Sequence, residues 1–185
     1  MNAIRKIIGP NFWRSLCLEG EDATVSRVKL EMVSHPSIHF ACHASQDIEN
    51  SLKSGFYLHD GRLDLAAIME QKITNCELAF LSACQTSTGD EKLSEEAVHL
   101  AAGMLAVGYR SVVATMWSIK DEYGPVVAEG FYKDLMERGT TSGQPGIDSA
   151  NASRALHQAI QAIRRQVGDT EQGLLTWVPY VHFGY

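Results

Sequence analysis

Two short apolar stretches of this 185-residue chain each end at a residue suited to nucleophilic chemistry. Residues 78–84 (Leu-Ala-Phe-Leu-Ser-Ala-Cys) stop at Cys84, and residues 37–43 (Ser-Ile-His-Phe-Ala-Cys-His) stop at His43. A cysteine thiolate is a strong nucleophile, and a neighbouring histidine can move protons to and from the reacting groups. If the two stretches are adjacent parallel strands, their ends lie about 5 Å apart. We therefore expect His43 within reach of Cys84.

The surrounding sequence predicts the elements that would position these two residues. Phe12 to Leu18 is predicted to be a strand, and a helix capped by Asp22 or Thr24 is predicted to run through about Val33. The strand at 37–42 follows, so the order strand–helix–strand indicates a βαβ unit of a parallel sheet. The dipeptide Asp60-Gly61 predicts a hairpin turn. Asp64 can cap a short helix over residues 65–71.

The second half of the chain continues the alternation of strands and helices. Helices are predicted at about 94–107, at 125–137 and over 152–167, with a strand at 111–117 and an edge strand near Pro179. Residues 138–147 are predicted to be a flexible loop. The expected fold is one α/β domain over residues 1–185, with a mainly parallel sheet and helices on both faces.

Composition excludes several classes of function. The chain has 16 Lys and Arg against 22 Asp and Glu, a net charge of −6, with no basic cluster, so we expect no nucleic-acid partner. No apolar run approaches 18 residues, so we expect no membrane partner. The amino terminus lacks the features of a signal peptide. The four cysteines have no CxxC spacing, which is typical of reduced thiols in a cytoplasmic protein.

The two reactive candidates also have ordinary structural interpretations. A buried cysteine in a strand usually serves as a small apolar residue, and Cys42 is predicted to be one. Cys84 differs because it stands at a strand end and a polar loop follows it. His39 is predicted to be a core histidine with a hydrogen bond. A zinc site from His39, Cys42, His43 and Cys84 is an alternative, although this spacing on a strand directs ligands to opposite faces.

The motifs, taken in order, resemble those of one protein family, the CHAT domains. The residues that carry the resemblance extend from about Glu19 to Gly184 and include 39–43 (His-Phe-Ala-Cys-His), 80–86 (Phe-Leu-Ser-Ala-Cys-Gln-Thr), 96–101 (Glu-Ala-Val-His-Leu-Ala) and 108–117 (Gly-Tyr-Arg-Ser-Val-Val-Ala-Thr-Met-Trp). CHAT domains are caspase-like cysteine protease domains that are often joined to tetratricopeptide repeats. The resemblance implies a caspase–haemoglobinase-like fold and protein or peptide substrates. It also allows repeat domains in a longer parent chain.

The resemblance also implies roles for individual residues. His43 and Cys84 correspond to the catalytic dyad, and backbone N–H groups of Ala44 and Cys84 would hold the oxyanion. The segment that includes Trp117 and Ser118 would pair with an extended substrate. No metal or other cofactor is needed for this chemistry. Asp47 and Asp121 follow the strands that end near His43 and Trp117, so they are predicted to line the substrate cleft and to favour a basic residue.

The chain departs from the family pattern at two places. The family usually has glycine after the catalytic histidine, where this chain has Ala44, and a positive φ at that position would be costly for alanine. The first strand of the family's sheet is expected to be missing, because Met1 falls inside the helix that follows that strand. We accordingly expect the isolated chain to be poorly stable, to exchange strands, or to lack turnover.

Three functions stay open at this point. The first is a cysteine endopeptidase that cleaves peptide bonds through a thioester intermediate. The second is a catalytically inactive, partial CHAT domain that serves as a protein-interaction module. The third is a Cys/His acyltransferase or hydrolase of small molecules.

Overall fold

The computed structural model describes residues 15–45, 47, 49–82, 84–85, 96–117, 119–120, 122–141 and 147–184. For residues 84–85, 96–98 and 138–141 this description covers the backbone only.

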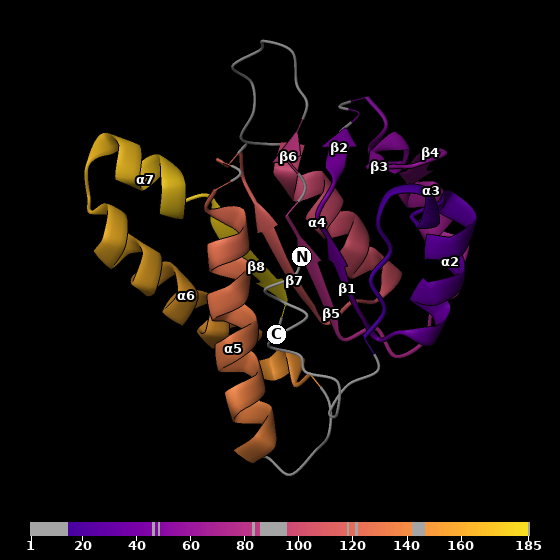
Figure 1. Ribbon diagram of the computed structural model, residues 1–185. Helices are drawn as coiled ribbons and strands as arrows, with labels where there is room; N and C mark the ends of the chain where they lie inside the picture. The colour runs from indigo at the N-terminus through magenta and orange to yellow at the C-terminus, as the bar shows by residue number, and fades with distance from the viewer. Residues whose placement is uncertain are drawn as a thin grey trace.

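A four-stranded sheet forms the centre of the molecule (Figure 1). Its strands are β1 (Ser37–Phe40), β5 (Leu78–Leu81), β7 (Ser111–Thr115) and β8 (Tyr180–Gly184), in the order β1-β5-β7-β8. The first three strands are parallel, and β8 runs antiparallel to β7. β5 and β7 are buried at every position, as expected for central strands with helices on both faces. This arrangement confirms the predicted α/β fold.

A second, smaller sheet lies at the carboxyl ends of the parallel strands (Figure 1). It contains β2 (His43–Ser45), β3 (Gly55–Leu58), β4 (Gly61–Asp64) and β6 (Cys84–Gln85), in the order β4-β3-β2-β6. β3 and β4 form the hairpin predicted at Asp60-Gly61. β2 pairs antiparallel with β3 and parallel with β6. The hairpin therefore supports β2 on one side, while β6 lies on the other.

Helices α2 and α3 begin at the side-chain caps that the sequence predicted. Thr24 Oγ1 accepts a hydrogen bond from Arg27 N at the start of α2 (Val25–Ser34), and Asp64 accepts one from Ala67 N at the start of α3 (Leu65–Met69). Such caps satisfy N–H groups that lack a partner within the helix. The other helices are α4 (Glu96–Val107), α5 (Gly124–Thr141), α6 (Ala152–Val167) and α7 (Glu171–Trp177), with short 3₁₀ turns at η1 (Gly20–Asp22), η2 (Ser51–Lys53) and η3 (Ser149–Asn151).

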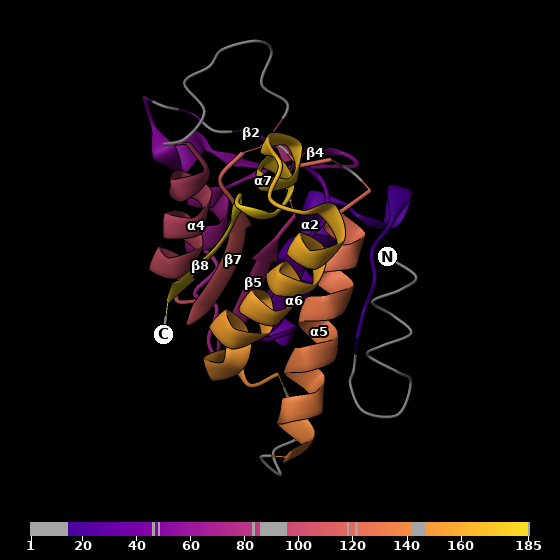
Figure 2. The ribbon, with the colours of Figure 1, turned by 90° about the vertical axis from the view of Figure 1, so that its left-hand side faces the viewer.

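Alternate residues of the central strands enter two separate hydrophobic cores. In β5, Ala79 and Leu81 pack with residues of α2, α3 and α4, whereas Leu78 and Phe80 pack with residues of α5 and α6. This is the two-residue period of a strand buried on both faces. Figure 2 shows α4 on one side of the sheet and α5 with α6 on the other. Helices on both faces were predicted, and the two cores confirm them.

Four local predictions differ from the structure. Residues 15–18, the described part of the strand predicted at 12–18, form no strand, and Leu16 is largely exposed instead of paired. The two apolar stretches are each broken in two, because β2 joins the hairpin sheet. Helix α5 continues to Thr141, four residues into the loop predicted at 138–147, and residues 142–146 lie outside the description. Helix α7 was not predicted.

Within the described ranges, no helix combines the length and the apolarity needed to cross a bilayer.

Candidate active site

One parallel strand pair continues through both sheets without a change of register. In the main sheet β1 pairs with β5, with Ser37 opposite Leu78 and Phe40 opposite Leu81. Beyond a short break, β2 pairs with β6, with His43 opposite Cys84 and Ala44 opposite Gln85. A hydrogen bond from Ser82 N to Phe40 O, 2.9 Å long, lies within this break. The backbone therefore places His43 and Cys84 side by side on neighbouring strands, which are spaced about 4.8 Å apart.

His43 stands at the accessible end of this pair. It is exposed, whereas the next residue, Ala44, is only 2% exposed. The alternation follows from the strand geometry, which turns successive side chains to opposite faces. Ala44 anchors the strand in the core, so the exposed His43 is held by a backbone that is itself fixed.

The substitution of alanine for glycine after His43 causes no backbone strain. Ala44 lies in β2 and pairs with Phe56 of β3. Among the described residues other than glycine, positive φ occurs at Lys72 and Asn75. Because Ala44 lies between β3 and β6, its N–H group faces along the sheet towards one of these strands. The role of Ala44 as an oxyanion donor stays a prediction.

The two residues that would complete a zinc site with the dyad lie on opposite faces of the sheet. The His39 ring stacks on Phe80, with ring centroids 4.7 Å apart, and its Nδ1 lies 3.2 Å from the Tyr132 hydroxyl. Cys42 packs instead against the other core. The described residues contain no group of three possible metal ligands. His39 is thus the hydrogen-bonded core histidine that its position predicts.

Cys42 is chemically suited to packing. Burial raises the pKa of its thiol to about 11. At neutral pH the thiol is therefore protonated, and the thiolate is the form that attacks carbonyl groups. This sets Cys42 apart as an inert neighbour of the candidate dyad.

Trp117 is hydrogen-bonded to helix α7. It follows β7, and its Nε1 donates a hydrogen bond to Leu175 O at 3.3 Å. Just before it, Met116 N donates to Pro179 O at 2.8 Å. The segment after β7 is therefore attached to the carboxyl-terminal part of the chain. Ser118 and Asp121, the other residues predicted for substrate binding here, lie outside the described residues.

Asp47 has a structural role in the loop after β2. Its Oδ1 accepts a hydrogen bond from Asn50 N at 2.8 Å, and its own N–H donates to Ser54 Oγ at 3.0 Å. Asn50 in turn caps the short turn η2. The carboxylate therefore stabilises this loop, four residues beyond His43, in addition to the charge it brings.

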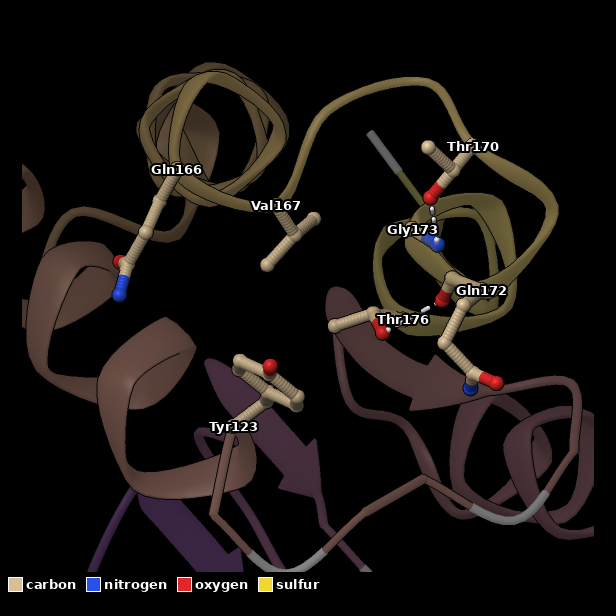
Figure 3. A pocket seen from close by; sticks show the side chains of 7 residues that line it. All are labelled: Tyr123, Gln166, Val167, Thr170, Gln172, Gly173 and Thr176. Atoms are coloured by element: carbon tan, nitrogen blue, oxygen red, sulfur yellow. Dashed lines mark hydrogen bonds between the residues drawn. The ribbon is translucent and has the colours of Figure 1, made fainter.

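A hollow near the same end of the sheet was not foreseen from the sequence. It has a volume of about 260 Å³ and lies between α6, α7 and the turn before α5 (Figure 3). Its wall includes Tyr123, Gln166 and Gln172. No motif joins these residues, and only the packing of α7 beside α6 brings them together.

Comparison with known families decides the relationship of this chain. A family model described as the CHAT domain matches residues 1–185, the whole chain. The chain belongs to the CHAT domain family. No curated protein matches it significantly. CHAT domains are caspase-like and protease-related, so the chain is a peptidase-like domain. The structure agrees with this family membership. The sheet is mainly parallel, and His43 and Cys84 lie in register at the carboxyl ends of adjacent strands.

Proposed function

We propose that this CHAT domain is a cysteine endopeptidase in which His43 and Cys84 form the catalytic dyad. The observation that carries the proposal is the register pairing of the two residues on β2 and β6. A nucleophile and its base must come within hydrogen-bonding reach, and neighbouring strands in register satisfy the backbone part of that requirement.

The reaction would proceed by acyl transfer. The Cys84 thiol gives its proton to the His43 imidazole, and the sulfur attacks the scissile carbonyl carbon. His43 then protonates the leaving amine as the carbon–nitrogen bond breaks, which leaves a thioester on Cys84. Water attacks the thioester with His43 as the base, and the thiol and a free carboxyl group are released. The exposure of His43 suits this cycle, because protons and water must reach it.

Backbone groups would bind the substrate around this dyad. The N–H group of Cys84 would stabilise the oxyanion, with Ala44 as the second predicted donor. The segment 117–119 would pair with the extended substrate, and the hydrogen bond from Trp117 to α7 supports a fixed position for its first residue. Asp47 and Asp121 would favour a basic residue near the cleavage point.

A thiol-directed peptide trap tests the proposal directly. Incubation with a peptide that carries a reactive acyloxymethyl ketone should label Cys84, as identified by mass spectrometry of the digested protein. Labelling should be lost in His43→Ala, because the unactivated thiol is mostly protonated. Equal labelling of Cys42 and Cys84, or labelling unaffected by His43→Ala, would contradict a dyad and would favour an inactive interaction module.

A further inference from the structure

We propose that the hollow between α6 and α7 is a subsite that binds an uncharged, amide-bearing side chain of the peptide substrate, asparagine or glutamine. This inference rests on the proposed function, because it assigns a second contact to the same substrate. The hollow of about 260 Å³ is smaller than the roughly 300–1,000 Å³ typical of pockets for drug-sized ligands. It has room for a side chain of a bound peptide.

The polar, uncharged residues that line the hollow favour an uncharged polar ligand. The lining residues are all uncharged: Tyr123, Gln166, Val167, Thr170, Gln172, Gly173 and Thr176. Figure 3 shows the Tyr123 ring between the two amides in this view, with Gln166 coming from α6 and Gln172 from α7. The phenol and the two amides together offer both donors and acceptors. An amide ligand needs the same mixture, since its own group has two donors and an acceptor.

The hydroxyl groups of the two threonines are already used within α7. Thr170 Oγ1 accepts from Gly173 N at 3.1 Å, and Thr176 Oγ1 donates to Gln172 O at 2.9 Å. These bonds fix the backbone of the α7 wall. The polar groups left for a ligand are therefore the Tyr123 hydroxyl and the two glutamine amides, for which no hydrogen bond to another described residue is found.

One ion pair close to the hollow in the chain is already satisfied. Arg164 and Asp169, at the end of α6 and just beyond it, bind each other through two hydrogen bonds of 2.6 and 2.7 Å. Arg164 also lies over the Trp177 ring, 4.9 Å from its centroid. The lining residues themselves carry no charge, so a Lys, Arg, Asp or Glu side chain entering the hollow would lose water without meeting an opposite charge in its wall.

The position of the hollow connects it with the proposed substrate path. Tyr123 lies at the turn before α5, shortly after Trp117, and Trp117 bonds to α7. The Ile119 side chain lies beside Gly124, at the start of α5. Figure 1 shows α7 at the same end of the sheet as β2 and β6. A peptide bound beside Trp117 would therefore lie close to the hollow, several residues from the scissile bond.

The test measures binding without turnover. Fluorescent peptides from a positional library, each with one position varied, are titrated into the full-length Cys84→Ala chain. At one position, Gln or Asn should bind about tenfold more tightly than Ala, Glu or Lys, which corresponds to one or two hydrogen bonds. Gln172→Leu and Gln166→Leu should each reduce this preference, and the double variant should abolish it. Both residues are exposed, so the fold should tolerate the changes.

A matched control is Gln158→Leu, an exposed glutamine of α6 outside the hollow, which should keep the full preference. The subsite would be overturned by a preference for a charged residue at the position that responds to the glutamine variants, by no preference for Gln or Asn at any position, or by a Gln or Asn preference that is unchanged in the double variant. Peptide cleavage that persists in Cys84→Ala would contradict the proposed mechanism instead, while leaving the measured side-chain preference intact. The two failures are thus distinguishable.

Discussion

The hydroxyl of Tyr132 lies 3.2 Å from Nδ1 of His39, and the two rings stack with their centroids 5.7 Å apart. Phe80 covers the His39 ring as well. Burial in this aromatic cluster lowers the pKa of His39 from 6.5 to about 4. The imidazole is therefore neutral at physiological pH.

This pair predicts a loss of stability in mild acid. In the unfolded chain His39 binds a proton near pH 6.5, whereas the folded protein resists protonation until about pH 4. Its contribution is therefore complete above pH 6.5 and decreases as the pH falls towards 4, by about 2–3 kcal/mol in the free energy of unfolding. Urea unfolding at several pH values should show a weaker pH dependence in His39→Gln. An identical pH dependence in both proteins would contradict the assignment.

Substitution by alanine is expected to have opposite effects on activity at Cys84 and at Cys42. Cys84→Ala should abolish peptidase activity with little change in the melting temperature, as should His43→Ala, which replaces an exposed residue. Cys42→Ala should keep most of the activity, because the Cys42 thiol stays protonated with a pKa of about 11. Its cost should be a modest loss of stability, about 1 kcal/mol or less, from lost packing. Rates with a fluorogenic peptide and thermal melts provide both measurements.

Asp47 allows charge and hydrogen bonding to be separated. Asp47→Asn keeps an oxygen that can accept from Asn50 N, so the loop should stay intact while the charge is lost. A preference for Lys or Arg in a substrate-library profile should then weaken, and Asp121→Asn should act in the same direction. Asp47→Ala should cost about 1 kcal/mol of stability in addition, because it leaves the N–H without its acceptor. If the profile of the unmodified protein shows no preference for Lys or Arg, Asp47 and Asp121 do not determine substrate specificity.

The close packing around Gly103 in α4 predicts that a larger residue there will destabilise the protein. A Cβ at this position would lie 2.4 and 2.7 Å from the two Cδ atoms of the buried Leu65. Gly103→Ala should therefore destabilise the protein by about 1–3 kcal/mol, despite the better helix propensity of alanine. Gly130→Ala in α5 is the comparison, because its Cβ would meet Ala159 Cβ at a milder 3.3 Å. Equal melting temperatures for the two variants would show that Leu65 moves freely.

Local signals predicted much of this fold, and long-range pairing explains what they missed. The caps at Thr24 and Asp64 and the hairpin at Asp60-Gly61 depend on neighbouring residues, so the sequence displays them. The break after Phe40 depends on β3, which joins β2 from outside the stretch. The α7 helix begins at the Thr170 cap and ends at Trp177, but the following Val178-Pro179 makes this region look more typical of a strand.

The same holds for the candidate site: local sequence signals predicted part of it, and tertiary packing determines the rest. The stretches ending at His43 and Cys84 were recognisable from their composition, and their pairing as parallel neighbours was a hypothesis that the strand register confirms. The hollow was not recognisable, because Tyr123 and Gln172 are separated by two helices and meet only through tertiary packing. The stacking partner of His39 was hidden for the same reason, since Tyr132 belongs to α5.

The register that pairs Ser37 with Leu78 is the same one that pairs His43 with Cys84. The relative setting of the two residues is therefore decided by the core, and a slip of β1 along β5 would displace them together with every buried side chain of the strand. Across the break, Phe40 stacks on Phe56 with ring centroids 4.0 Å apart, which holds the second sheet against the first. The alignment of His43 with Cys84 is therefore as rigid as the packed core of the domain. A small loop could not hold the two residues with the same rigidity.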